Sequence, residues 1–333
     1  MTEKRRLGSG GPLVSAIGVG AMSFSDMYGP TTEAQSHAVL DAALEAGITH
    51  IDTANIYGMG ESERVIGSFL KANTSARNAF VLATKAGITR NAAGERCFDN
   101  SIEHLEAELD ASLRRLGVEA VDLFYVHRRD HDVPIEDVAG GLSLLVEKGK
   151  TKAVGFSEIA PASLRLAHAV QPVAAVQSEY SLSVRAPELG LVQTCAELGV
   201  ALVAFSPVGR SLLTDNPLSF EASQASVFLR ENPRFLPPNY ERNIAACEPL
   251  RQLAAKMGEP TAALAVAWLL AQGDHVLPIP GTRSVDHFRE LVRAAHLNLS
   301  ASDLEAIERA LPVGWAHGDR YSTAQWRGPE SYC

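Results

Sequence analysis

Short apolar runs with strand character alternate with helical segments along almost the whole chain. About eight strand–helix units can be counted, from a strand at 17–20 to a strand at 276–280 and a helix at 285–295. Parallel strands need long crossover connections, so this alternation predicts a parallel sheet linked by helices. Eight units is the number that closes a TIM (β/α)8 barrel, and the 333 residues fit a single barrel domain spanning 1–333.

Helix-capping patterns mark where these units begin and end. Thr32 and Gln35 form a capping-box pattern that predicts a helix ending at Gly47. Asn100 with Glu103 predicts the start of another helix, whose apolar residues recur at helical spacing: Ile102, Leu105, Leu109, Leu113 and Leu116. Strands are expected between the helices at 49–52, 80–85, 121–127, 152–157, 173–177 and 201–206.

Three segments lie outside the repeating pattern. The glycine-rich stretch 4–14 predicts an N-terminal β-hairpin that caps the bottom of the barrel. Ser300 and Asp303 predict the cap of an extra C-terminal helix, followed by a tail. The stretch 209–240, with its four prolines, is the longest irregular segment and is expected to be a substrate-side loop.

The formal charge of -9, from 30 basic and 39 acidic residues, argues against nucleic acid or an anionic membrane as the main partner. The most apolar stretch, 262–271, is too short to span a bilayer, and the N-terminus lacks an apolar signal core. A cytoplasmic protein is therefore expected. Widely spaced thiols fit a reducing compartment and provide neither a disulfide framework nor a metal cluster: Cys97, Cys195, Cys247 and Cys333.

Four side chains are expected to converge at the mouth of the barrel. Asp52, Lys85 and His127 end the second, third and fourth strands, and Tyr57 lies in the loop just after Asp52. The carboxyl ends of barrel strands face one common mouth, so these residues should be neighbours. Alone, each is more often a cap, a surface charge or a packed ring, and it is their convergence that indicates a site.

The set suits the protonation of an oxygen that gains negative charge. A free phenol has a pKa of about 10, and a nearby ammonium lowers that value. Lys85 is expected to act in this way on Tyr57, while Asp52 holds the ammonium in place. His127 can orient a carbonyl oxygen or assist the proton relay. None of the four is an obvious nucleophile, so acyl transfer is disfavoured.

A metal-dependent barrel hydrolase using His127, His131 and Asp52 is a competing interpretation. The sequence lacks the His-x-His spacing at a strand end that would support this interpretation. Activity that survives a strong chelator would exclude it. No metal is therefore expected.

With these four residues and the motifs around them, the sequence resembles the aldo-keto reductase family over nearly its whole length. The matching motifs, in chain order, are GVGAM at 18–22, Asp52 through YG at 57–58, GESE at 60–63, TK at 84–85, His127, GFS at 155–157, QSEYS at 177–181, FSPVGR at 205–210 and IPGTR at 279–283. Residues 125–128, PRF at 233–235, Asn239 and Asn243 look most like the microbial and plant branch, which includes pyridoxal and broad aldehyde reductases.

The resemblance implies an NADPH-dependent oxidoreductase that reduces aldehydes or ketones to alcohols. Hydride would come from nicotinamide C4 and the proton from Tyr57, with Lys85 and Asp52 tuning the acid and His127 orienting the substrate. The implied cofactor positions are Ala21, Met22, Asp52, Ser157, Gln177, Phe205, Ser206, Pro207, Val208, Gly209, Arg210, Gly281, Arg283, His287 and Glu290.

Within that set, Ser157 and Gln177 match positions that bond the nicotinamide carboxamide, and Phe205 matches the aromatic that stacks on the ring. Residues 206–210 would follow the pyrophosphate. Arg283 follows Gly281 at a predicted helix start, where backbone amides favour an anion, so binding of the 2′-phosphate, and hence NADPH over NADH, is expected.

Two residues depart from the common family pattern. Glu158 stands where many members carry Asn, and Leu291 stands where Asn often bonds the adenine edge. A nicotinamide-binding sensor subunit with little turnover is the alternative function within this fold. The partner is expected to be a small carbonyl substrate, whose identity the residues do not give. The sequence does not distinguish a monomer from a homo-oligomer.

Overall fold

The computed structural model describes residues 3–332; Met1, Thr2 and Cys333 of the predicted domain lie outside the described residues. Its central sheet has eight strands in the order β12-β11-β10-β9-β8-β5-β4-β3, and all neighbouring pairs are parallel. The strands are β3 (Val19–Gly20), β4 (His50–Asp52), β5 (Val81–Ala86), β8 (Leu123–Val126), β9 (Val154–Ser157), β10 (Val173–Glu179), β11 (Ala201–Phe205) and β12 (Val276–Pro278).

Backbone hydrogen bonds join the two edges of this sheet. The Gly18 amide donates to the Pro278 carbonyl at 2.9 Å, and the Gly20 amide donates to the Pro280 carbonyl at 2.9 Å. The contact requires glycine, because a Cβ on Gly20 would lie 2.5 Å from the Ile279 carbonyl oxygen. The predicted TIM barrel is confirmed, with sequential strands as neighbours throughout.

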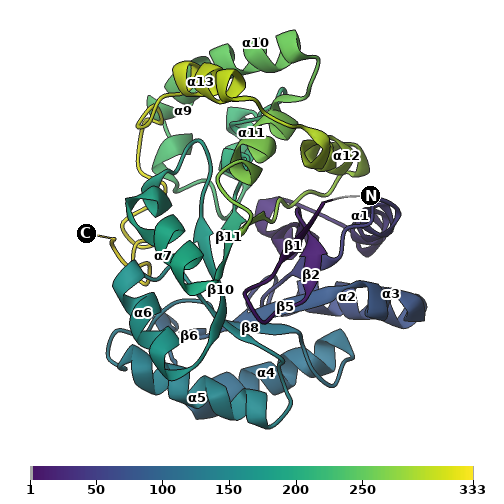
Figure 1. The fold of residues 1–333 in the computed structure, drawn as a ribbon, viewed down its shortest axis with the longest axis vertical. Coiled ribbons are helices and arrows are strands. Elements are labelled where there is room, and N and C mark those ends of the chain that lie inside the picture. The colour runs from purple at the N-terminus through teal and green to yellow at the C-terminus, as the bar shows by residue number, and fades with distance from the viewer. Residues whose placement is uncertain (1–2, 333) are drawn as a thin grey trace.

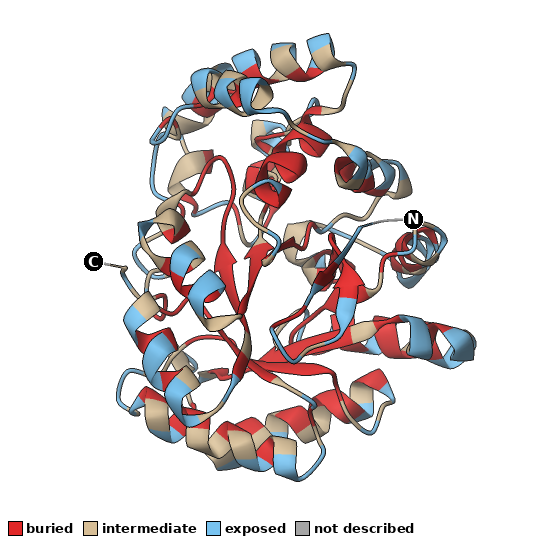
Figure 2. Ribbon diagram, viewed as in Figure 1, coloured by how far each residue is buried: buried red, intermediate tan, exposed pale blue. Residues whose placement is uncertain are grey.

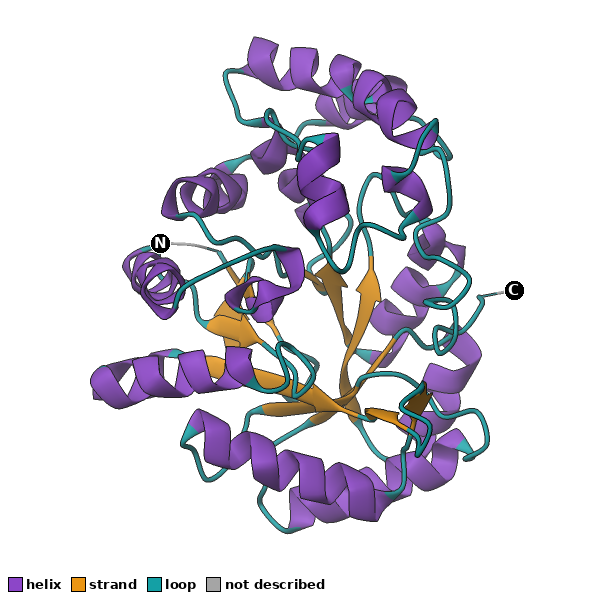
Figure 3. Cartoon of the chain, turned by 180° about the vertical axis from the view of Figure 1, so that it is seen from behind, coloured by secondary structure: helices purple, strands orange, loops and turns teal. Residues whose placement is uncertain are grey.

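Helices surround the strands, as Figures 1 and 3 show from opposite sides. The crossover helices are α1 (Glu33–Glu45), α2 (Glu61–Ala72), α3 (Thr74–Ala79), α4 (Ile102–Leu116), α5 (Ile135–Glu147), α6 (Pro161–Val170), α7 (Leu191–Leu198), α11 (Thr261–Leu270) and α12 (Val285–Arg293). The last helix, α13 (Ala301–Ala310), begins with the predicted capping box of Ser300 and Asp303, and Thr32 with Gln35 caps α1 as predicted. No helix within residues 3–332 is long and apolar enough to cross a membrane.

The core has two layers. One packs the outer face of the strands against the inner faces of the helices, which are buried in Figure 2. The other fills the barrel interior with side chains such as Leu123, Tyr125 and Val203. The hairpin of β1 (Lys4–Arg6) and β2 (Leu13–Ser15) adds Leu7 and Val14 to this interior cluster, so the predicted N-terminal cap plugs one end of the barrel.

The predicted cap of α4 is wrong by one residue. Ser101, not Asn100, accepts the hydrogen bond from the His104 amide. Asn100 instead donates to the Arg128 carbonyl at 3.1 Å and accepts from the Asp130 amide at 2.7 Å. Both residues are good helix caps, and the tertiary partners of Asn100 decide between them.

Two segments on the carboxyl side of the barrel are more ordered than expected. After β5 the chain forms an unpredicted hairpin of β6 (Ile88–Arg90) and β7 (Arg96–Phe98). The predicted irregular segment 209–240 contains short helical turns: η4 (Gly209–Ser211), α8 (Phe220–Ala225), η5 (Pro233–Phe235) and the start of α9 (Asn239–Ala246), which leads into α10 (Glu248–Met257).

Candidate active site

A cavity of about 760 Å³ opens at the carboxyl ends of the strands. Asp52, Tyr57 and His127 line it, together with every implied cofactor residue except Gly209. Segment 209–240 also lines it through Arg210, Leu218 and Phe228 among others, as expected for a loop on this side. Lys85 does not line the cavity and is completely buried. The structure therefore places most of the predicted site around one hollow.

Lys85 and Asp52 form a buried ion pair below the cavity. The Lys85 ammonium donates to the Asp52 carboxylate and, at 2.7 Å, to the Thr53 carbonyl oxygen. The second Asp52 oxygen accepts from the Gln177 amide at 2.8 Å. Burial lowers the pKa of Lys85, against the attraction of Asp52. Two partners, Lys85 and Gln177, thus fix the orientation of the Asp52 carboxylate.

Tyr57 lies between this pair and His127. The Lys85 nitrogen is 5.2 Å from the centre of the Tyr57 ring, which is within cation–π distance. The Tyr57 and His127 rings meet edge to face, with centroids 5.8 Å apart and an angle of 83°. Both rings border the cavity, so a small molecule there can contact the phenol and the imidazole together.

The expected lowering of the Tyr57 pKa is wrong. Burial, and then the Asp52 carboxylate, raise the pKa of the phenol above its ordinary value, and Arg128 opposes them. The Lys85 charge is balanced by its salt bridge to Asp52, which is why it does not produce the expected effect. The phenol is therefore protonated at neutral pH, the state that a proton donor needs.

His127 is a neutral imidazole. Its burial, together with the nearby cations Arg128, Lys85 and Arg96, holds its pKa well below the ordinary histidine value. Its Nδ1 is buried and has no hydrogen-bond partner among the described residues. A neutral ring has one donor and one acceptor nitrogen, so it can donate a hydrogen bond without carrying charge. The third ligand of the hydrolase interpretation, His131, does not line the cavity, and no metal-binding group of three is assembled within residues 3–332.

Ser157 and Gln177 present complementary hydrogen-bonding groups. The Ser157 hydroxyl oxygen accepts from Arg128 at 2.9 Å and so keeps its own proton to donate. The Gln177 amide nitrogen donates to Asp52, which leaves its carbonyl oxygen as an acceptor. One donor and one acceptor on the cavity wall match a primary carboxamide, and half-buried Phe205 adds an aromatic face nearby.

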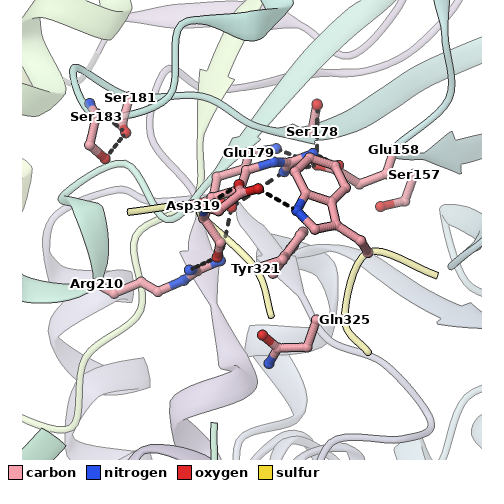
Figure 4. A network of polar contacts seen from close by, with 12 residues as sticks. Ser157, Glu158, Ser178, Glu179, Ser181, Ser183, Arg210, Asp319, Tyr321 and Gln325 are labelled. Atoms are coloured by element: carbon pink, nitrogen blue, oxygen red, sulfur yellow. Dashed lines mark hydrogen bonds and ion pairs between the residues drawn. The ribbon is translucent and has the colours of Figure 1, made fainter. Parts of the chain in front are cut away.

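A buried four-member ion network crosses the mouth of the barrel beside the cavity. Arg320, from the C-terminal tail, pairs with Glu158 and, at 3.3 Å, with Glu179, while Arg210 pairs with Glu179 at 2.8 Å. The Tyr321 ring lies near both arginines, with its centre 5.2 Å from the Arg210 guanidinium and 4.7 Å from that of Arg320. Figure 4 shows Tyr321 with Glu158, Glu179 and Arg210. The network fastens the tail to the ends of β9 and β10 and to the loop after β11.

This network changes the expectation for two residues. Glu158 does not line the cavity; both its oxygens face Arg320, and one also accepts from the Glu179 amide at 2.8 Å. Arg210 borders the cavity, but its guanidinium is committed to Glu179 and to the Arg320 carbonyl. Ser206, Arg210 and Ser211 have positive φ values of 52°, 56° and 86°, so this loop holds a strained backbone of the kind found at ligand sites.

Arg283 marks the far end of the cavity. Its guanidinium donates to the Pro30 carbonyl at 2.8 Å, and no carboxylate pairs with it among the described residues. It directly precedes Ser284, the cap of α12, so backbone amides and a free cation lie together. His287 and Glu290 line the same end, and Leu291 contributes an apolar wall there instead of an amide.

Two site residues, Arg96 and Arg320, were not identified from the sequence, and Arg128 is expected only as part of a pocket-lining segment at 128–132. Arg320 comes from the tail, Arg96 from the unpredicted hairpin, and Arg128 follows His127 directly. Of the three, only Arg128 has a local signal in the sequence, because it directly follows a strand-end histidine.

Comparisons with known proteins agree with this geometry. The model of the aldo/keto reductase family matches residues 16–312. The chain is 38% identical to aldo-keto reductase yakc [NADP(+)] of Schizosaccharomyces pombe, covering 94% of this chain and 93% of that protein. It is also 38% identical to probable aldo-keto reductase 1 of Glycine max, covering 95% of this chain and 91% of that protein.

Two solved structures share the fold. The glycerol dehydrogenase AKR11B4 from Gluconobacter oxydans superposes with a TM-score of 0.80 at 27% identity, covering 92% of this chain and 94% of that one. The holo form of aldo-keto reductase AKR11C1 from Bacillus halodurans gives a TM-score of 0.77 at 27% identity, covering 98% and 100%. A family match over most of the barrel, joined to relatives of this similarity, establishes that the chain is an oxidoreductase of the aldo-keto reductase family.

Proposed function

We propose that residues 1–333 form one catalytic domain that reduces aldehydes or ketones to alcohols with NADPH, using Tyr57 as the proton donor. The observation that carries the proposal is the placement of a protonated phenol and a neutral imidazole, edge to face, on the wall of one cavity. A carbonyl oxygen that contacts both would receive a proton from one and a hydrogen bond from the other.

The raised pKa of Tyr57 is compatible with this role. An alkoxide is a stronger base than a phenolate, so the proton moves downhill once negative charge develops on the substrate oxygen. Arg128, which opposes the rise in that pKa, would stabilise the phenolate left behind. Lys85 compensates the Asp52 charge beneath the ring, so that the carboxylate does not oppose the transfer at full strength.

The cofactor is NADPH, whose nicotinamide supplies the hydride. Ser157 and Gln177 would hold the carboxamide, since they offer one donor and one acceptor, and Phe205 would face the ring. The strained loop 206–211 would follow the pyrophosphate. Arg283, with no acidic partner among the described residues, would bind the 2′-phosphate at the start of α12.

Turnover separates this proposal from the sensor alternative. The protein is mixed with NADPH and a reactive aromatic aldehyde, and consumption of NADPH and formation of the alcohol are followed together. Stoichiometric alcohol formation over many turnovers is expected. Tight NADPH binding without turnover on a panel of aromatic aldehydes, pyridoxal and short ketones would favour the sensor.

Arg283→Ala is expected to weaken NADPH binding much more than NADH binding. The free energy lost is that of a charge-assisted hydrogen bond, about 1.5–3 kcal/mol, or roughly a 10- to 150-fold rise in the NADPH Kd. Titrations of both nucleotides by fluorescence provide the measurement.

Arg289→Ala is the matched control for this experiment. Arg289 lies on α12, the helix that Arg283 precedes; 66% of its side chain is exposed, and it does not line the cavity. It should leave both constants near their original values. Equal losses of NADPH and NADH affinity in Arg283→Ala would show that Arg283 does not read the phosphate.

A further inference from the structure

Two arginines on the cavity wall have no acidic partner. Arg96 lies on β7 of the hairpin after β5, and Arg128 follows His127 at the end of β8; both line the cavity that Tyr57 borders. Among the ion pairs within residues 3–332, neither arginine has a carboxylate within 4.0 Å. Two guanidinium groups without a salt bridge therefore border one cavity, and the carboxylate whose charge acts on Arg128, Glu158, is itself paired with Arg320.

The hydrogen bonds of these two arginines leave capacity unused. Arg128 is buried; one terminal nitrogen donates to the His127 carbonyl and to Ser157, the other makes a long 3.4 Å hydrogen bond to the Tyr321 hydroxyl, and its Nε has no partner among the described residues. The only contact found for the Arg96 guanidinium in the described chain is with the Phe98 ring, 5.4 Å from its centroid. Both side chains therefore keep N–H donors beside the cavity that a ligand could use.

The fold holds these like charges close together, which is energetically unfavourable. Burial, with the like charges of Arg128 and Arg327, lowers the pKa of Arg96 below its ordinary value. Arg90 stands directly opposite Arg96 across the hairpin, a pairing that is destabilising between like charges. The tail closes over the same place, since a Cβ on Gly328 would lie 2.6 Å from the Phe98 ring and 3.2 Å from the Arg128 Cβ. An anion bound here would relieve this repulsion.

The position of the two arginines separates them from the expected cofactor phosphates. In the sheet order, Arg96 and Arg128 follow β5 and β8, whereas residues 206–211 follow β11 and Arg283 follows β12. Between the two groups lie Ser157 and Gln177, on the walls expected to hold the nicotinamide. The unpaired cations therefore lie on the substrate side of the cavity, next to His127.

We propose that the enzyme prefers carbonyl substrates that carry a carboxylate, which Arg96 and Arg128 bind while the carbonyl oxygen faces Tyr57 and His127. This inference rests on the proposed reductase function and names the class of substrate for the same site. Guanidinium groups suit the task, because each can offer two parallel N–H donors to a carboxylate.

A matched pair of substrates tests the preference. The kcat/KM of the wild-type protein with NADPH is measured for para-carboxybenzaldehyde and for its methyl ester, which keeps the aldehyde and removes the charge. The acid is expected to exceed the ester by about tenfold or more, the value of one charge-assisted hydrogen bond. The ratio is expected to fall as salt is added, because screening weakens the attraction.

Three variants test whether Arg96 is responsible for the preference for the acid. Arg96→Gln is expected to lower the acid-to-ester ratio about tenfold, mainly through the KM of the acid. Arg96→Lys keeps the charge and is expected to keep an intermediate ratio. Arg90→Gln removes the same charge from the exposed neighbour across the hairpin, which does not line the cavity, and should leave the wild-type ratio in place.

The outcomes distinguish this inference from the function on which it rests. Efficient turnover of both aldehydes by the wild type with a ratio of about one or less would overturn the carboxylate preference and leave the reductase function standing. So would an unchanged ratio in Arg96→Gln. Failure of the wild type to reduce these two aldehydes, with turnover of other members of the panel above, would overturn the carboxylate preference alone, and failure on the whole panel would overturn both proposals.

Discussion

Replacing Tyr57 by phenylalanine is expected to lower the turnover number by about 10²–10⁴-fold or more, the scale on which a positioned acid contributes. The substitution removes one hydroxyl and keeps the ring that meets His127 edge to face. The NADPH Kd should change little, because Tyr57 is not among the residues expected to hold the cofactor. The measurement is kcat for a reactive aldehyde, together with a nucleotide titration.

Tyr180→Phe is the control for that prediction. Tyr180 is also buried, but its hydroxyl donates to Glu188 at 2.9 Å and does not line the cavity. Its removal should leave kcat within a small factor of the wild-type value. Near-wild-type turnover in Tyr57→Phe would refute the assignment of the acid.

Replacing Arg320 by methionine is expected to lower the free energy of unfolding by about 3–5 kcal/mol, the cost of leaving a buried charge without its partner. Glu158 is 1% exposed and would lose the cation that holds both of its oxygens (Figure 4). Chemical denaturation of wild type and variant provides the comparison. Arg309→Met is the control, because Arg309 and Glu305 are 70% and 72% exposed, and such pairs contribute about 0–1 kcal/mol.

The Arg320 effect should depend on pH in one direction. Burial alone would raise the pKa of Glu158, but the attraction and hydrogen bonds of Arg320 outweigh it and lower that pKa below the ordinary 4.5. A lowered carboxyl pKa stabilises the folded state above the unfolded pKa and loses that contribution as pH falls through the folded pKa. The stability gap between wild type and Arg320→Met should therefore narrow below about pH 4.5. A gap that widens on acidification would contradict the network.

Much of the barrel and of its catalytic corner could be predicted because both follow from local pattern. Alternating strands and helices dictate a parallel sheet, and closure of that sheet brings the ends of β4, β5 and β8 to one rim. Asp52 ends β4, Lys85 is the last residue but one of β5, and His127 directly follows β8, so their proximity needs no knowledge of packing.

The parts that could not be predicted depend on distant partners. Arg320 and Glu158 are 162 positions apart, and nothing in the tail indicates which carboxylates it will meet. The pKa of Tyr57 was expected to fall because a lysine is near; it rises because burial and Asp52 act more strongly, and the depth of burial is a tertiary property. The choice of Ser101 over Asn100 as a helix cap was decided in the same way, by partners in the loop after β8.

Transfer of an isotope label from the cofactor to the product shows whether the enzyme carries out the proposed reduction. NADPH carrying deuterium at nicotinamide C4, on the face that the enzyme uses, is incubated with the protein and an aromatic aldehyde, and the product is analysed by mass spectrometry and NMR. We expect the corresponding alcohol with one deuterium on the carbinol carbon, and the same labelled product at a far lower rate from Tyr57→Phe. The proposed function would be contradicted if the alcohol carried no deuterium when either C4 position of NADPH was deuterated. It would also be contradicted if no alcohol formed at saturating concentrations of NADPH and aldehyde.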